Sequence, residues 1–122
     1  MGDSIYMLHG VQILECAADG PLIRNERDAV DVIGAAFSGR AGLVAIPVSR
    51  LSDAFFSLKT RVAGEIMQKF VNYNMRLVIL GDIADRLAES DALRDFVFET
   101  NRGKQVWFLA DKAQLEARLA QP

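Results

Sequence analysis

The sequence predicts an α/β fold with a mainly parallel sheet, and three neighbouring features in the middle of the chain indicate this class. Residues 43–48 and 77–80 are short, continuous apolar runs, which are typical of strands buried on both faces of a sheet. The segment between them carries apolar residues at helical spacing. A strand, a helix and a second strand in this order form a βαβ unit, whose crossover is expected to be right-handed.

Two strands and a helix are predicted ahead of this unit. Residues 5–8 and 11–16 are apolar runs joined by a two-residue connection that contains glycine, which indicates an antiparallel hairpin. From Glu26 onward apolar residues recur at helical spacing, and Gly39 follows as a stop signal. The chain is therefore expected to open with a hairpin and a first helix.

A second, longer helix is predicted after the first buried strand, which Pro47 ends. This helix is expected to begin between Ser52 and Leu58, with Ser52 or Asp53 as its N-cap. Asn74 is the expected C-cap. One apolar stripe runs along the segment, at Leu58, Val62, Ile66, Phe70 and Tyr73.

The rest of the chain repeats the alternation of helix and strand. Ser90 or Asp91 caps a helix that ends near residues 101–103. The other predicted elements are a buried strand, a helical turn, a last strand and a closing helix, at residues 77–80, 84–88, 105–110 and 112–120. The predicted order is ββαβαβαβα in a single domain over residues 1–122, with an N-terminal β-hairpin and the helices packed on the sheet.

Composition argues against several broad classes of protein. The 122 residues suit one domain, and a formal net charge of -2 with interspersed acidic and basic residues argues against nucleic-acid binding. No apolar stretch approaches the roughly twenty residues that span a bilayer, and the first residues do not read as a secretory leader. A single cysteine, Cys16, cannot form an internal disulfide, which is consistent with a reducing compartment. We therefore expect a cytoplasmic protein that binds neither nucleic acid nor membrane.

The sequence carries none of the common catalytic or cofactor motifs. It has no glycine-rich dinucleotide loop, no phosphate loop and no Gly-x-Ser-x-Gly elbow. His9, the only histidine, and Cys16 stand near opposite ends of one predicted strand, on the order of 20 Å apart, so they are not expected to act together. The sequence thus predicts no catalytic residue, no metal site and no cofactor, and it favours a non-enzymatic protein.

Four stretches of the chain resemble a bacterial family of uncharacterised proteins, domain of unknown function number 4180. They are LVAIP at residues 43–47, AGEIMQKFVNYNMRL at 63–77, ALRDFV at 92–97 and NRGKQVWF at 101–108. The resemblance extends over nearly the whole chain. It implies a size and a fold, but it supplies no catalytic residue.

The predicted order of elements is also similar to the STAS fold, which occurs in anti-sigma-factor antagonists and in the cytoplasmic tails of anion transporters. In those antagonists a kinase phosphorylates the serine of an Asp-Ser pair at the start of the second helix. Here Ser52 precedes Asp53, and Ser57 is flanked by Phe56 and Leu58, so the pair is absent as written. The resemblance leaves Ser52 and Ser57 as candidate phosphoacceptors.

The second predicted helix and the loop before it are the expected surface for a protein partner. The helix carries a polar strip made of Arg61, Glu65, Gln68, Lys69 and Asn72. Gly64 lies in the middle of the helix, where glycine costs about 1 kcal/mol relative to alanine, so another backbone is expected to approach it closely. That backbone belongs either to the sheet, which we favour, or to a second subunit, so a homodimer is left open. We therefore expect a regulatory or protein-binding module, with a partner that the sequence does not identify.

An alternative site is predicted at the carboxyl ends of the strands, where ligands bind near a switch in the strand order of an open parallel sheet. The side chains expected there are Ser49, Arg50, Asp82 and Asp111. Two neighbouring carboxylates could bind a divalent ion or share a proton, which would make the protein a small enzyme or a ligand-binding or metal-binding protein. The competing interpretation is that Asp82 and Asp111 only accept backbone hydrogen bonds at the starts of the following helices.

Overall fold

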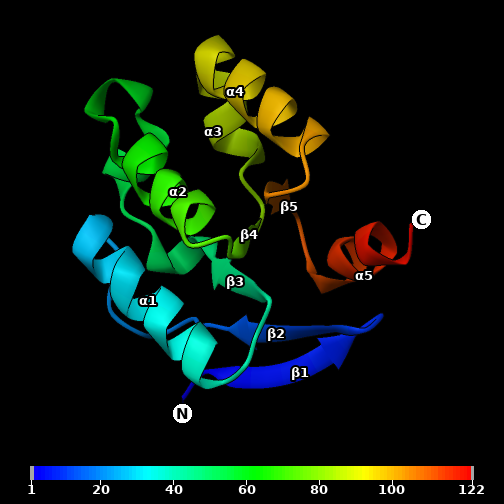
Figure 1. The fold of residues 1–122 in the computed structure, drawn as a ribbon. Helices are drawn as coiled ribbons and strands as arrows, with labels where there is room; N and C mark the ends of the chain where they lie inside the picture. The colour runs from blue at the N-terminus through cyan, green and yellow to red at the C-terminus, as the bar shows by residue number, and fades with distance from the viewer. Residues whose placement is uncertain (1, 122) are drawn as a thin grey trace.

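The computed structural model describes residues 2–121 and contains one five-stranded sheet (Figure 1). The strands follow one another across the sheet in the order of the sequence, and they are β1 (Ser4–Leu8), β2 (Val11–Glu15), β3 (Leu43–Pro47), β4 (Arg76–Leu80) and β5 (Val106–Leu109). The first two strands pair antiparallel, and every later pair is parallel. The predicted α/β class, the N-terminal hairpin and the mainly parallel sheet are confirmed.

The hairpin closes through a two-residue turn with positive φ at both positions. His9 has φ of 48° and Gly10 has φ of 81°. Both values are those of a type I′ turn, whose twist matches the twist of the two strands that it joins. The turn fixes the register, in which Leu8 lies opposite Val11.

Within residues 2–121 five α-helices accompany the sheet, and they are α1 (Glu26–Ser38), α2 (Val62–Asn72), α3 (Ala84–Glu89), α4 (Asp91–Arg102) and α5 (Lys112–Ala120). Three of them have a side-chain N-cap. Asn25 accepts a hydrogen bond from the backbone N–H of Asp28 at 2.9 Å, and Ser90 accepts one from Leu93 at 3.1 Å. Caps of this kind satisfy one of the free N–H groups in the first turn of a helix.

The predicted start of the second helix is wrong, because α2 begins at Val62. The preceding residues form three 3-10 turns, η1 (Val48–Arg50), η2 (Asp53–Phe56) and η3 (Leu58–Thr60). Phe55 is 1% exposed in the core, and the left-handed φ of 65° at Arg61 separates the turns from α2. Burial of the aromatic residue therefore prevails over the helical spacing that the sequence suggests.

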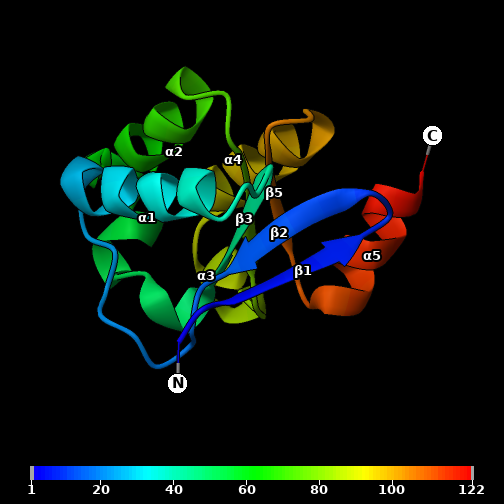
Figure 2. The same cartoon turned by 60° about the horizontal axis from the view of Figure 1, so that its bottom comes forward.

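The two faces of the sheet are covered unequally. Along β4, Leu77 and Ile79 belong to a large apolar cluster with α1, α2 and α4, whereas Val78 belongs to a smaller cluster with α5. Strands in sequential order, joined by crossovers of one hand, place their connecting helices on one face. Helix α5 is therefore the helix that packs on the opposite face (Figure 2), which we call the α5 face.

The sequential strand order contradicts one premise of the strand-end prediction. The order β1-β2-β3-β4-β5 contains no reversal, so this sheet has no switch point at which two crossovers diverge. The crevice that binds ligands in doubly wound sheets forms at such a point.

Within residues 2–121, no helix combines the length and the apolar character needed to cross a bilayer.

Candidate functional site: a basic cleft on the α5 face

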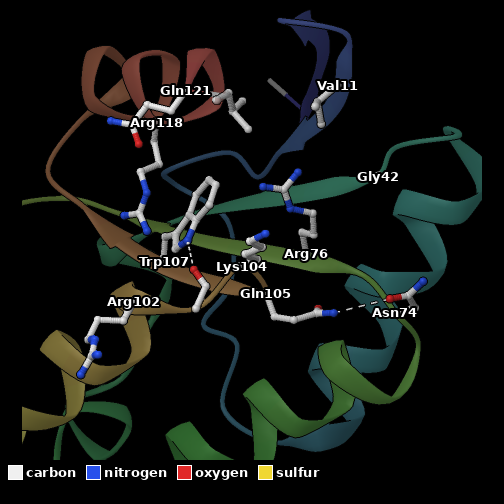
Figure 3. A pocket seen from close by; sticks show the side chains of 12 residues that line it. Val11, Gly42, Asn74, Arg76, Arg102, Lys104, Gln105, Trp107, Arg118 and Gln121 are labelled. Carbon is white, nitrogen blue, oxygen red and sulfur yellow. Dashed lines mark hydrogen bonds between the residues drawn. The ribbon is translucent and has the colours of Figure 1, made fainter.

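A cleft of about 640 Å³ lies at the amino ends of the parallel strands (Figure 3). Arg76 is the first residue of β4, and Gln105 directly precedes β5, so the start of each strand contributes a wall. Arg118 and Leu119, in the last turn of α5, form the opposite wall. The cleft exists because a single helix does not cover this whole face of the sheet.

Positive charge is concentrated in the cleft. Four of its twelve lining residues are basic, and none is acidic. The four are Arg76, Arg102, Lys104 and Arg118. Because the whole chain has a formal net charge of -2, this cluster does not reflect a generally basic protein. A cleft with charges of one sign and walls of low dielectric constant raises the local concentration of anions.

Trp107 holds two of the four cations in place. The guanidinium carbon of Arg118 lies 4.4 Å from the centroid of the indole, and that of Arg76 lies 4.9 Å from it. Figure 3 shows the indole between these two side chains. Trp107 is 6% exposed as a residue, and its Nε1 donates a hydrogen bond to the carbonyl of Gly103 at 2.8 Å. Cation–π contact therefore fixes both guanidinium groups on a rigid aromatic support.

Arg76 is a partly buried cation that no carboxylate of residues 2–121 compensates. Desolvation by burial lowers the pKa of its guanidinium, although an arginine stays charged in proteins. Within residues 2–121 no carboxylate forms an ion pair with it. A partly buried cation that has lost hydration without gaining a counter-charge favours an anionic ligand.

The other three cations are not equivalent. Arg102 forms an ion pair with Glu99 at 3.4 Å, and Arg118 donates a hydrogen bond to the backbone carbonyl of Asn101. Both arginines lie in last turns of helices, where cations are favoured by the partial negative charge of the helix end. Lys104 lies in the loop before β5, and Arg76 begins β4. The partial charge of a helix end therefore does not account for the cation at either position.

Gln105 adds polar groups to the wall of the cleft. Its Nε2 donates a long hydrogen bond of 3.5 Å to Oδ1 of Asn74. Its Oε1 is buried and has no hydrogen-bond partner within residues 2–121. A buried acceptor without a donor costs about 1–3 kcal/mol, so this wall retains an unused hydrogen-bonding capacity.

None of the four cleft cations was among the residues predicted from the sequence. They are spread from position 76 to position 118, and only the fold brings them together. One signal was present, because the family-like stretch NRGKQVWF contains Arg102, Lys104 and Trp107. A charged residue at the first position of a buried strand, as at Arg76, was the second signal.

The predicted polar strip on α2 is divided in the structure. Arg61, Glu65 and Gln68 border a hollow of about 560 Å³ between α2 and α4. Lys69 faces α1 instead, where its Nζ lies 3.5 Å from a carboxylate oxygen of Glu26. Asn72 accepts a hydrogen bond of 2.8 Å from Nε2 of Gln68 and does not line the hollow.

Gly64 faces the same hollow, which corrects the expectation that the sheet approaches it. A Cβ atom built on Gly64 would meet no heavy atom of the described chain within 4 Å. The opposite face of α2 packs against the core through Ile66 and Phe70, which are both fully buried. No packing within residues 2–121 therefore accounts for a glycine at this position.

The two candidate phosphoacceptors lie in the turns before α2. Ser52 precedes η2, and Ser57 lies between η2 and η3; both are partly buried. The carbonyl of Ser57 accepts a hydrogen bond of 2.8 Å from Oγ1 of Thr60. Ser57 also borders a hollow of about 420 Å³ that Lys59 and Arg86 line.

The residues of the predicted strand-end site have separate structural contacts. Oγ of Ser49 donates to the carbonyl of Ala18 at 2.8 Å. Asp82 accepts a hydrogen bond of 2.9 Å from the backbone N–H two residues later, and Asp111 caps α5 by accepting one of 2.9 Å from Gln114. A hollow of about 250 Å³ at this end of the sheet is lined by Asp82, but not by Ser49, Arg50 or Asp111. The capping interpretation accounts for both carboxylates.

Cys16 and His9 occupy unrelated environments. Cys16 is 3% exposed, and burial raises the pKa of its thiol to about 12, so the reactive thiolate is disfavoured at neutral pH. His9 is a turn residue whose Nε2 lies 3.9 Å from Glu116. Among residues 2–121, no group of three or more histidine, cysteine, aspartate or glutamate side chains is placed to hold a metal ion.

A comparison with family models matches residues 8–119 to the family described as Domain of unknown function (DUF4180). The chain belongs to the DUF4180 family. All four cations of the basic cleft and Trp107 lie within the segment that matches DUF4180. Searches of curated proteins and of solved structures found no match. The similarity of this DUF4180 chain to the STAS fold therefore stays a prediction.

Proposed function

We propose that this chain is a non-enzymatic binding module that takes a small, multiply charged anion into the basic cleft. The observation that carries the proposal is Arg76, a partly desolvated cation at the start of β4 that has no carboxylate partner in the described residues. Four cations around one cleft favour a ligand with more than one negative charge.

The dimensions and the total charge support a small ligand over a nucleic acid. A cleft of about 640 Å³ lies within the range of roughly 300–1,000 Å³ that is typical of small-molecule sites. A formal net charge of -2 differs from the strongly basic balance that is typical of domains that bind the phosphate backbone of a nucleic acid.

The arrangement around Trp107 indicates how the anion would be held. Arg76 and Arg118 both contact the indole, so their like charges repel each other across the ring. A phosphate or carboxylate bound beside the ring accepts paired hydrogen bonds from a guanidinium and relieves this repulsion. Because the two arginines already contact the indole, we do not expect an aromatic ligand to stack on it.

The lining of the cleft supports binding without chemistry. Its twelve residues include no histidine, cysteine, aspartate, glutamate, serine or tyrosine. These residue types supply most nucleophiles and general bases in enzymes. A ligand in this cleft would therefore be held by charge and hydrogen bonds and released unchanged, as in a regulatory module.

Isothermal titration calorimetry with pyrophosphate, and separately with citrate, tests the cleft. We expect saturable binding of at least one of these probes, and we expect Arg76→Gln to weaken it at least tenfold, or about 1.4 kcal/mol. Arg76→Lys is expected to be intermediate, because lysine keeps the charge but loses the planar pair of donors. Arg27→Gln, on the exposed surface of α1, is the matched control and should leave the affinity unchanged.

Two results would contradict this function. The first is the absence of saturable binding of either probe at low ionic strength, where electrostatic attraction is strongest. The second is binding that Arg27→Gln weakens as much as Arg76→Gln does, because this would indicate attraction to the surface in general. Circular dichroism spectra of each variant establish that the fold is retained.

A second candidate function is protein binding through α2, and the exposure of Gly64 favours it. Glycine costs about 1 kcal/mol relative to alanine inside a helix, yet no part of the described chain uses the space that it leaves. The hollow beside it combines the apolar side chains of Leu58 and Phe96 with a rim of Arg61 and Glu65. This combination of an apolar centre and a polar rim is typical of a protein interface.

Two variants test this surface. Gly64→Ala is expected to raise the free energy of unfolding by about 0.5–1 kcal/mol in urea, since the added methyl group meets no other atom. Capture of a specific protein from a lysate of the source cells should fall with Gly64→Ala and with Glu65→Lys. Glu116→Lys, on the exposed side of α5, is the control for the charge reversal and should have no effect. Equal capture by all four proteins would argue against an interface at α2.

A further inference from the structure

We propose that β1 pairs with the β1 of a second copy of this chain to form a symmetric dimer with a continuous ten-stranded sheet. This strand lies at one edge of the sheet (Figure 2), and within residues 2–121 its strand partner is β2 alone. An unpaired edge strand presents a row of free backbone N–H and C=O groups, so the surface that complements it is another β-strand.

The backbone groups that face outward belong to Ile5 and Met7. Leu8 and Val11 flank the two-residue turn and therefore form the hydrogen-bonded pair that closes the hairpin. Hydrogen-bonded positions alternate along an antiparallel pair, so Tyr6 also points its backbone groups toward β2. The backbone groups of Ile5 and Met7 then point away from the sheet.

The side chains of these two residues add apolar surface to the open edge. Ile5 is 49% exposed and Met7 is 59% exposed. Edge strands of monomeric proteins commonly carry lysine, proline or a bulge that prevents pairing. The strand SIYML has none of these features, so it lacks the usual protection against a second strand.

The opposite edge of the sheet is protected, which shows that the two edges differ. The side-chain amide of Asn101 donates to the carbonyl of Phe108 at 3.1 Å and accepts from the N–H of the same residue at 2.6 Å. These two hydrogen bonds occupy the outward backbone groups in the middle of β5. Of the two sheet edges that the structure describes, only the β1 edge is therefore free to add a strand.

A second copy complements β1 better than an arbitrary strand does. In an antiparallel pair centred on Tyr6, Ile5 of one copy lies opposite Met7 of the other, and symmetry forms this apolar pair twice. The same register brings Asp3 of one copy to the turn residue His9 of the other. Oδ1 of Asp3 already accepts a hydrogen bond from the N–H of Ala17, and Oδ2 is the oxygen that would accept one from His9 of the other copy. The apolar pairs and this polar contact are therefore available when the strand meets its own copy.

Sedimentation velocity measures the oligomeric state directly. We expect a mass near twice 13.5 kDa at protein concentrations on the order of 100 μM, which lies well above the micromolar Kd of a weak specific complex. Met7→Lys should shift the protein to the monomer, because it places a charge at the paired edge. Phe98→Lys removes a residue that is 64% exposed on α4 and should leave the dimer intact.

A disulfide tests the register. Tyr6 would lie opposite its own copy at a non-hydrogen-bonded position, where the two Cα atoms are about 4.5 Å apart, which is within reach of a disulfide. Tyr6→Cys should therefore form a covalent dimer under mild oxidation, whereas Met7→Cys should not, since Met7 lies opposite Ile5. The native Cys16 is buried and should not interfere. A monomer at all concentrations, or a dimer that Met7→Lys leaves unchanged, would overturn the proposal.

Discussion

Replacement of Arg50 by alanine is expected to lower the free energy of unfolding by about 3 kcal/mol, although the sequence alone suggested a ligand-binding role for this residue. Arg50 is 7% exposed and is a buried charged residue of the described chain. Its Nε donates to the carbonyl of Pro21 at 2.5 Å, and its Nη1 donates to the carbonyl of Ala17 at 2.8 Å. Alanine would remove the donor to the carbonyl of Pro21 and would leave the carbonyl of Ala17 with only the long hydrogen bond of 3.4 Å from the N–H of Gly20. It would also open a cavity beside them.

The same side chain ties the loop between β2 and α1 to the carboxyl end of β3. The backbone carbonyl of Arg50 accepts the N–H of Ile23 at 2.7 Å, which anchors the loop at a second point. The guanidinium lies directly against Gly20, where a Cβ atom would come within 2.6 Å of Nη1. The loop therefore depends on a long cationic side chain and on a glycine that leaves room for it.

Urea denaturation followed by circular dichroism checks this expectation. Arg24→Ala is the matched control, because the Arg24 side chain is 67% exposed and its loss should cost less than about 0.5 kcal/mol. Arg50→Lys should be intermediate, since lysine keeps the charge but cannot donate in two fixed directions. Equal stability of Arg50→Ala and Arg24→Ala would show that the buried guanidinium is not what holds the loop.

Replacement of Asn101 by alanine is expected to cost about 2–4 kcal/mol of unfolding free energy and to promote aggregation. The Asn101 amide satisfies both the N–H and the C=O of Phe108, a core residue that is 6% exposed. Alanine would leave two backbone groups of β5 unpaired and would uncover the edge that they form. The carbonyl of Asn101 also receives the hydrogen bond from Arg118, so this residue connects the sheet edge to the basic cleft.

Two further variants separate the contributions of the amide. Asn101→Asp keeps an acceptor for the N–H of Phe108 but places a carboxylate oxygen against its C=O, so we expect a loss of stability at least as large as for alanine. Asn72→Ala is the control, because the side chain of Asn72 is exposed on α2 and accepts a hydrogen bond from Gln68 on the same helix. Light scattering at the same protein concentrations measures aggregation. Soluble Asn101→Ala with the stability of Asn72→Ala would show that β5 does not need this closure.

Local patterns determined most of the elements of this protein. The apolar runs at β3 and β4 and the cap residues Ser90 and Asp111 lie where the sequence places them. These features depend on residues close together in the chain, because strand burial and N-caps are satisfied within a few positions. The α/β class follows from the alternation of such elements, and it was therefore accessible without the structure.

Tertiary contacts decided the start of α2. Helical spacing extends back to Leu58, but Phe55 enters the core at 1% exposure and the chain turns at Arg61. The free energy gained by burying a large aromatic side chain exceeds the small differences in helix propensity between the alternatives. Such competition is decided by what lies on the other side of the core, which a local pattern does not contain.

The assembly of the candidate site was decided by the fold. The sequence itself determined that the chain has interspersed charges and no catalytic motif, whereas the sequential strand order placed α1, α2 and α4 on one face and left part of the α5 face open. That opening brings Arg76 and Arg118, distant in the chain, to the same indole. The physical reason is that charge clustering depends on distance in space, and distances between remote residues are set only when the strands take their order in the sheet.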